Sequence, residues 1–302
     1  MQNCKNSSYD IYQNITDQII EKLEQGFIPW HKPWSAYGAA SSYITRKPYR
    51  GINALLMNML PYEKPYYLTF KQAKDLGGTV RKGSKAVPVI FWNFVFLHAD
   101  TKKKITEAEA RKLPADQVLK SAYLKEYKVF NIDQIDNVEI DIPELILKPE
   151  NEVLEACENI ITGMSNAPAI KNSDAKRAFY TPSSDYVNIP DIKFFDSSEF
   201  YYDTLFHELI HSTGHQSRLN RPEITKMNSF GSKDYSKEEL VAELGGSFLC
   251  GYTGIQNERT LENSTAYIQG WVKKLESDKR FIIEAAAKAQ KAADYILNLD
   301  RS

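Results

Sequence analysis

Residues 205–215 read LFHELIHSTGH, and this stretch determines which kind of domain the second half of the chain forms. On a helix, positions i and i+4 lie on one face, so His207 and His211 can both point at one ion. Glu208 follows the first histidine directly and can reach a water on that ion. Two imidazoles that bind Zn²⁺ beside a glutamate that acts as general base form the HExxH arrangement.

The flanking residues favour a helix over roughly 197–213. Ser197 or Ser198 can cap its start, and Gly214 can end it just after the second histidine. The alternative is an ordinary helix that carries two histidines on its surface. The glutamate between histidines at this spacing favours the metal site.

A catalytic zinc needs a third protein ligand and one open position. The segment KEELVAE (237–243) places Glu239 and Glu243 at i and i+4 of a second predicted helix, so both lie on one face. One would bind the metal, and the other would orient a ligand histidine by accepting its second ring N–H. We expect Glu239 to be the ligand and Glu243 the orienting carboxylate, with the reverse assignment open. His215 is a weaker candidate because Gly214 breaks the register.

These residues predict a mechanism for peptide hydrolysis. Zinc lowers the pKa of a bound water to about 7, and Glu208 would take its proton and pass it to the leaving amine. Tyr235 is a candidate donor to the developing oxyanion. Residues 180–190 alternate polar and apolar side chains, which is typical of an edge strand that binds an extended peptide and equally of an ordinary strand.

The charge distribution divides the chain near residue 133. Residues 1–133 hold 20 Lys and Arg against 12 Asp and Glu, whereas residues 134–302 hold 18 against 27. A basic half indicates a polyanionic partner, although the two halves could instead attract and mask each other. Aromatic residues lie among these cations, as in proteins that hold single strands without reading sequence. The expected DNA contacts are Trp30, Lys32, Trp34, Tyr49, Arg50, Lys71, Arg81, Lys82 and Lys85.

Periodicity and turn residues predict an α+β protein of two domains. The boundaries are 1–133 for a basic, aromatic domain, 134–149 for an acidic linker, and 150–302 for a helix-rich domain with a small sheet. In the first domain we expect helices over 8–25, 51–60 and 69–76, and two paired strands over 86–98 and 121–132. In the second we expect helices over 150–164, 197–213, 236–251, 261–275 and 278–298, with short strands near 168–171 and 178–189.

Several classes of protein are excluded or disfavoured by the composition. No apolar run approaches 18 residues, so we expect no membrane-spanning helix, and the N-terminus lacks the apolar core of a secretory signal. The three cysteines, Cys4, Cys157 and Cys250, are far apart and form neither a disulfide framework nor a CxxC site. A reducing cytoplasm is therefore the expected location.

The chain resembles the ArdC-type antirestriction proteins over nearly its whole length. The stretches that carry the resemblance are DIYQNITDQIIEKLEQGFIPWHKPW (10–34), YRGIN (49–53), TFKQAKDLGGTVRKGSKAVPVIFW (69–92), AFYTPSSDYVNIP (178–190), LFHELIHSTGH (205–215), RLNR (218–221), EELVAELGGSFLC (238–250) and AYIQGWVKKLESDKR (266–280). The resemblance implies an N-terminal domain that binds single-stranded DNA and a C-terminal zincin-like metallopeptidase domain. It also implies carriage on mobile elements and protection of incoming DNA from restriction.

The same resemblance maps the metal residues onto His207, Glu208 and His211. Related repressor-cleaving peptidases take a glutamate ligand about thirty residues downstream on a separate helix, which favours Glu239. The leading hypothesis is a zinc peptidase, with one Zn²⁺ per chain, that binds single-stranded DNA and hydrolyses an unidentified protein. The alternative is a non-enzymatic protein that shields single strands and whose metal site is structural or vestigial. Glu208 favours the enzyme, because a structural metal site does not need it.

Overall fold

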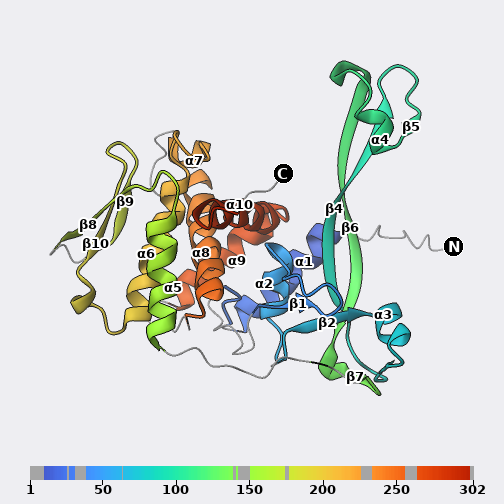
Figure 1. The fold of residues 1–302 in the computed structure, drawn as a ribbon, viewed down its shortest axis with the longest axis horizontal. Helices are drawn as coiled ribbons and strands as arrows, with labels where there is room; N and C mark the ends of the chain where they lie inside the picture. The colour runs from blue at the N-terminus through green and yellow to red at the C-terminus, as the bar shows by residue number, and fades with distance from the viewer. Residues whose placement is uncertain are drawn as a thin grey trace.

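The computed structural model describes residues 10–25, 27–30, 39–62, 64–138, 141, 150–173, 177–225, 233–255 and 264–299. Figure 1 shows two parts, a helix-rich body and a sheet with a long two-stranded ribbon beside it. The elements of the first half are α1 (Ile11–Glu24), β1 (Ser41–Ser42), α2 (Ile52–Asn58), β2 (Tyr66–Thr69), α3 (Phe70–Asp75), β3 (Thr79–Val80), β4 (Val87–His98), β5 (Lys104–Ile105), α4 (Glu107–Ala110), β6 (Val118–Asn131) and β7 (Ile135–Asp136). The elements of the second half are α5 (Glu150–Gly163), β8 (Ala169–Ser173), β9 (Phe179–Thr181), β10 (Tyr186–Pro190), α6 (Ser198–Thr213), α7 (Pro222–Thr225), α8 (Lys233–Thr253), α9 (Ser264–Ser277) and α10 (Phe281–Ile296).

The first half is built on a five-stranded sheet of order β1-β2-β6-β4-β5. The predicted pairing of its two long strands is confirmed: β4 and β6 are antiparallel, from Val87 opposite Val129 to His98 opposite Val118. β7 pairs with β3, so the packed part of this half continues to Asp136, into the segment 134–149. The mixed helix and sheet content agrees with the predicted α+β class.

One hydrophobic core joins the two halves. α1 begins at Asp10, whose carboxylate accepts the N–H groups of Tyr12 and Gln13, as expected of an N-cap. Its apolar side chains, at four-residue spacing, are buried in the same cluster as α6, α8, α9 and α10. Trp30 lies in this cluster with its ring edge-on to Trp271, at a centroid distance of 6.0 Å. The N-terminal helix therefore packs as part of the helical body.

Polar contacts fasten the same junction. The side-chain amide of Asn53 in α2 donates to the carbonyl of Ile90 and accepts its N–H, both at 2.8 Å. Arg50 forms an ion pair with Asp294 of α10. The N–H of Gly51 donates to Gln290 of α10 at 2.9 Å. α2 and the two residues before it thus link the internal strand β4 to the last helix.

The second half places α6 against α8 and beside a small sheet. That sheet has the order β8-β10-β9, so β10 is central and β9 is at the edge. A Cβ atom on Gly245 of α8 would lie 2.6 Å from Cδ1 of Ile210 on α6. Glycine costs a helix about 1 kcal/mol relative to alanine, but here it allows the two helices to approach closely. This close contact brings the start of α8 over the histidines of α6.

Candidate metal centre

α6 holds both histidines of the HExxH motif on a rigid helix. The hydroxyl of Ser197 accepts the N–H of Phe200 at 3.1 Å, so Ser197 is the N-cap, one of the two serines predicted for that role. Gly214 follows the last turn, and its N–H donates to the carbonyl of His211 at 2.9 Å. The apolar face of α6 is buried in the shared core and consists of Leu205, Phe206, Leu209 and Ile210. The opposite face is left to present the polar residues.

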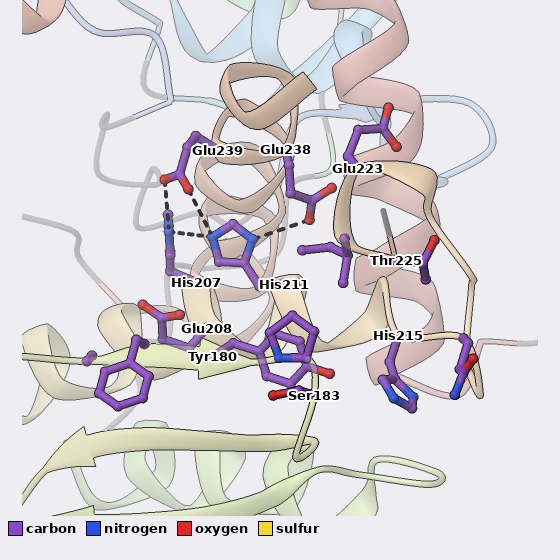
Figure 2. Close-up of a pocket in the computed structure, with 15 residues that line it drawn as sticks. Tyr180, Ser183, His207, Glu208, His211, His215, Glu223, Thr225, Glu238 and Glu239 are labelled. Carbon is purple, nitrogen blue, oxygen red and sulfur yellow. Dashed lines mark hydrogen bonds and ion pairs between the residues drawn. The ribbon is translucent and has the colours of Figure 1, made fainter. Parts of the chain in front are cut away.

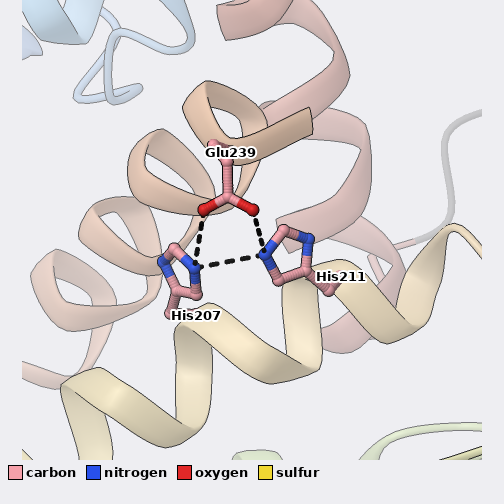
Figure 3. Close-up of side chains that lie close together, drawn as sticks. All are labelled: His207, His211 and Glu239. Carbon is pink, nitrogen blue, oxygen red and sulfur yellow. Dashed lines mark hydrogen bonds and ion pairs between the residues drawn. The ribbon is translucent and has the colours of Figure 1, made fainter. Parts of the chain in front are cut away.

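His207, His211 and Glu239 converge on one point (Figure 3). Their ligand atoms all lie within 4.8 Å of one another. The two Nε2 atoms are 3.2 Å apart, and the Glu239 oxygens lie 3.8 Å from His207 Nε2 and 3.6 Å from His211 Nε2. Two nitrogens bound to one tetrahedral zinc at about 2.0–2.1 Å would be about 3.3 Å apart. Two imidazole nitrogens and one carboxylate therefore fit a divalent metal with an open fourth position.

Glu208 lies beside this cluster without belonging to it. The side chain is largely buried and lines the same cavity as His207 and His211 (Figure 2). Its negative charge is one of those that raise the pKa of His211. The position is that of a carboxylate available for proton transfer next to the metal ligands.

A buried ion pair supports His211 from behind. Oε1 of Glu238 lies 3.3 Å from Nδ1 of His211, and Glu238 also accepts hydrogen bonds from the guanidinium of Arg221. Arg221 donates further to Thr213 Oγ1 at 2.6 Å and to the carbonyl of Ile210 at 2.8 Å. Burial by itself would lower the pKa of His211, but the hydrogen bond to Glu238 and the nearby carboxylates raise this pKa to about 9.

Sequence reasoning missed both members of this ion pair. It assigned the orienting carboxylate to Glu243, whereas the contact with Nδ1 of His211 comes from Glu238. Glu243 lies one turn further along α8, and the metal-binding group found among the described residues contains Glu239 and not Glu243. Arg221 lies in the RLNR segment, and two consecutive glutamates precede the apolar run of α8. Both were signals that could have indicated the pair.

The cluster opens into a cavity of about 700 Å³ between α6, α8 and the edge of the small sheet (Figure 2). Phe179 and Tyr180 of β9 and the flanking residues Ala178, Pro182 and Ser183 form part of its wall. Of the segment 180–190 that alternates polar and apolar residues, only the part in β9 lies at the edge, because β10 is paired on both sides. Among the described strands β9 has a neighbour on one side only, and its other side can bind an extended chain.

A second polar cluster fastens the β9–β10 turn to the end of α6. The Tyr180 hydroxyl donates to Asp185 at 2.8 Å, and the Arg218 guanidinium forms an ion pair with the same carboxylate. Nε of Arg218 donates to the carbonyl of Ser212 on α6 at 2.7 Å. His215 lines the cavity with Nδ1 4.0 Å from Asp185, outside the group that can hold a metal.

The residues expected to contact DNA fall into different environments. Trp30 is only 1% exposed and packs on Trp271, so its ring has no free face for a base. Tyr49 packs edge-on to Tyr67 and is partly buried, which raises its pKa to about 12. Arg50 is paired with Asp294. These three side chains hold the structure together.

Four of the remaining predicted contacts are cations in the segment that runs from α3 to the start of β4. Lys71, Lys82 and Lys85 are exposed. Arg81 donates to the carbonyl of Asp133 and lies 3.4 Å from the carboxylate of Asp136, so it braces the β3–β7 pair. Lys32, Trp34 and the side chain of Tyr235 lie outside the described residues.

Comparison with protein families gives two matches along the chain. Residues 9–130 match the N-terminal domain of anti-restriction factor ArdC, and residues 155–288 match the zincin-like metallopeptidases. In the part of the chain that the structure describes, no helix combines the length and apolar character needed to cross a membrane.

Solved structures give a similar result. The metal-free crystal structure of the antirestriction protein ArdC from plasmid R388 is 34% identical, with a TM-score of 0.74, and the match covers 97% of this chain and 100% of that one. The Mn(II)-bound structure of ArdC is 36% identical, with a TM-score of 0.71, over 96% of this chain and 98% of that one.

Two further proteins are similar in sequence. One is much longer than this chain, and the other is uncharacterized. A DNA primase TraC of Escherichia coli is 34% identical over 300 residues, which are 96% of this chain but only 27% of the primase. The uncharacterized protein y4eC of Sinorhizobium fredii is 30% identical over 95% of this chain and 91% of its own length. The chain thus corresponds to about a quarter of the primase.

Proposed function

This chain belongs to the ArdC antirestriction family, and from that premise we propose that it is a zinc-dependent peptidase that binds single-stranded DNA. The observation that carries the peptidase proposal is the convergence of His207, His211 and Glu239 beside Glu208. A binding protein with a structural metal has no need of a carboxylate at that position.

The chemistry of the ligand set favours zinc as the native metal. Two imidazoles and one carboxylate are typical of catalytic zinc sites, whereas Mn²⁺ prefers mainly oxygen ligands. The Mn(II)-bound ArdC structure supports a divalent ion in this family. We therefore assign one Zn²⁺ per chain, held by His207, His211 and Glu239.

In the proposed reaction the chain's own groups position the substrate and move the proton. When bound, the metal supplies a Lewis acid that polarises the scissile carbonyl and acidifies water. The edge strand β9 pairs with an extended segment of the substrate through backbone hydrogen bonds. Glu208 takes the proton of the attacking water and delivers it to the nitrogen of the leaving amine. Tyr235 keeps its proposed role as a donor to the developing oxyanion.

The DNA-binding part of the proposal concerns the first half of the chain. Its support is the match to the N-terminal domain of ArdC and the excess of Lys and Arg over Asp and Glu before residue 134. A basic surface attracts the phosphate backbone, and this attraction weakens as salt rises. We propose that the protein coats incoming single strands and cleaves a host protein at or near that DNA.

The test compares host proteins cleaved by the wild-type chain and by Glu208→Gln. Both are incubated with a cell extract, with and without single-stranded DNA, and new protein termini are identified by mass spectrometry. We expect cleavage products only with the wild type, while the variant retains its zinc. Equal products from both would remove Glu208 as the base. DNA binding without products from either would leave the non-enzymatic shielding protein as the function.

A further inference from the structure

The exposed apolar side chains of the described residues are concentrated on one element. Fourteen large apolar side chains are exposed among all the described residues. Six of them lie on the two strands β4 and β6, here called the β4–β6 ribbon. Five of the six are aromatic: Phe91, Trp92, Phe94, Tyr123 and Tyr127. Figure 1 shows the ribbon standing beside the helical body, with β5 and α4 at its far end. Apolar rings gathered on a projecting surface indicate a binding site.

The strand register divides these rings between two faces. Directly opposite residues of an antiparallel pair share a face. Trp92, Phe94 and Phe96 alternate along β4 and lie opposite Leu124, Ala122 and Lys120. The three rings therefore form a row, here called the aromatic ladder, with a spacing of about 7 Å along the strand. Phe91, Tyr123 and Tyr127 lie on the other face, where the ammonium group of Lys125 lies 4.9 Å from the ring centre of Tyr127.

The ladder combines open rings with positive charge. Trp92 is 49% exposed and Phe94 48% exposed. The ammonium group of Lys120 lies 4.0 Å from the ring centre of Phe94 and 5.7 Å from that of Phe96. By the strand register, Lys120 and Lys128 share the face of the ladder with the acidic residue Glu126, whereas Lys125 lies on the other face. Rings and cations in such a row suit a ligand with both flat faces and negative charge.

The ladder also lies on the side of the ribbon that meets the peptidase half. Ile90 and Leu124 share its face, and both pack against the core that contains α6, α8 and α10. The opposite face begins with Val87 and Val89, which belong to a separate small cluster with Tyr67. A strand bound on the ladder would therefore run next to the helical body.

We infer that the aromatic ladder with Lys120 is the surface on which single-stranded DNA binds. This inference rests on the proposed binding of single strands and places it on residues that the composition did not single out, except as members of an aromatic-rich region. Unstacked bases can lie on the rings of Trp92 and Phe94, while Lys120 meets the phosphates. Duplex DNA hides its base faces and cannot use the rings. A protein partner fits less well, because lysine is depleted at the centres of protein interfaces.

The experiment measures the binding of a fluorescein-labelled oligothymidylate of about twenty nucleotides to the full-length chain by anisotropy. The test variant is Trp92→Ala/Phe94→Ala. The matched control is Phe91→Ala/Tyr123→Ala, which removes two rings of nearly equal exposure from the opposite face. Because all four side chains are exposed, we expect all variants to melt within a few degrees of the wild type.

The ladder variant should bind at least about tenfold more weakly, since stacking on an aromatic ring is worth about that much per base. Its dependence on salt should be unchanged, whereas Lys120→Ala should reduce the salt slope by about 0.7. The control should bind like the wild type. If the ladder variant binds like the wild type, or the control loses as much affinity, the ladder is not the site. Equal affinity of the wild-type chain for a duplex of the same length would also contradict the assignment of the ladder as the site. If the wild type itself does not bind, the proposed function fails instead.

Discussion

Glu238 and Glu239 are consecutive residues of α8, yet they contact opposite nitrogens of the same imidazole. Glu238 lies 3.3 Å from Nδ1 of His211, and Glu239 lies 3.6 Å from its Nε2 (Figures 2 and 3). Glu238 therefore fixes which nitrogen of His211 faces the cavity, and Glu239 completes the metal site. Orientation of a ligand histidine by an outer carboxylate is a general feature of metal centres.

Glu239→Gln should weaken zinc binding by more than tenfold, because it replaces the third ligand by a neutral amide. Zinc affinity can be measured by competition with a chromophoric chelator. The matched control is Glu243→Gln on the same helix, for which we expect an affinity close to that of the wild type. A larger loss in the control than in Glu239→Gln would reverse the two assignments.

Arg221→Met should destabilise the fold by about 3–5 kcal/mol, because it leaves the buried carboxylate of Glu238 without its guanidinium. Urea denaturation of the metal-free protein measures this change. The double variant Arg221→Met/Glu238→Gln removes the uncompensated charge and should recover part of the loss. A double variant no more stable than the single one would show that the ion pair carries no such coupling.

Trp30→Ala should cost about 3–5 kcal/mol of unfolding free energy, since it empties a fully buried site against Trp271. Phe70→Ala is the control in the same half of the chain, because Phe70 is exposed and its loss should change stability by about 0.5 kcal/mol or less. Weaker DNA binding by Trp30→Ala at unchanged stability would return Trp30 to the DNA-binding surface.

Asp185 should make stability depend on pH. Burial would raise the pKa of its carboxyl, but the hydrogen bonds from Arg218 and Tyr180 and the charges of Arg218 and His215 lower this pKa below its usual value. Its contribution is therefore present above the unfolded-state pKa of about 3.9 and is lost as the pH falls through the lower folded-state pKa.

Asp185→Asn should thus reduce the urea midpoint at pH 7 and reduce it much less near pH 3. The comparison with the wild type at both pH values isolates this carboxyl from others that titrate in the same range. An equal difference at both pH values would mean that Asp185 contributes through its shape and hydrogen bonds alone, without its charge.

Local sequence was sufficient for the elements whose signals lie within a few residues. The four-residue spacing of Ile15, Ile19 and Leu23 indicates a helix, and these residues form the buried face of α1. Thr69 caps α3 where a helix was expected. The β-branched and aromatic run of β4 predicted a strand and its partner β6. Each of these features depends on helical or extended periodicity, which the chain carries in its own order of residues.

Long-range packing decided the residues that the sequence assigned differently. Trp30 and Trp92 both lie in aromatic, basic surroundings, but Trp30 is covered by a helix some 240 positions away and Trp92 is exposed on the ribbon. Composition does not distinguish the two tryptophans, because the burial of each depends on which residues, distant in sequence, pack against it. The same reason explains Arg50, whose partner Asp294 lies on the last helix.

The sequence by itself determined that His207 and His211 share a helix face with Glu208 between them, because the period of the α-helix fixes that geometry locally. Only the tertiary structure decided that Glu239 completes the cluster and that Glu238 and Arg221 stand behind it. The rotation of α8 about its axis, set by the close packing of Gly245 on Ile210, selects which glutamate faces the histidines. That rotation comes from contacts between helices, and no short stretch of the chain encodes it alone.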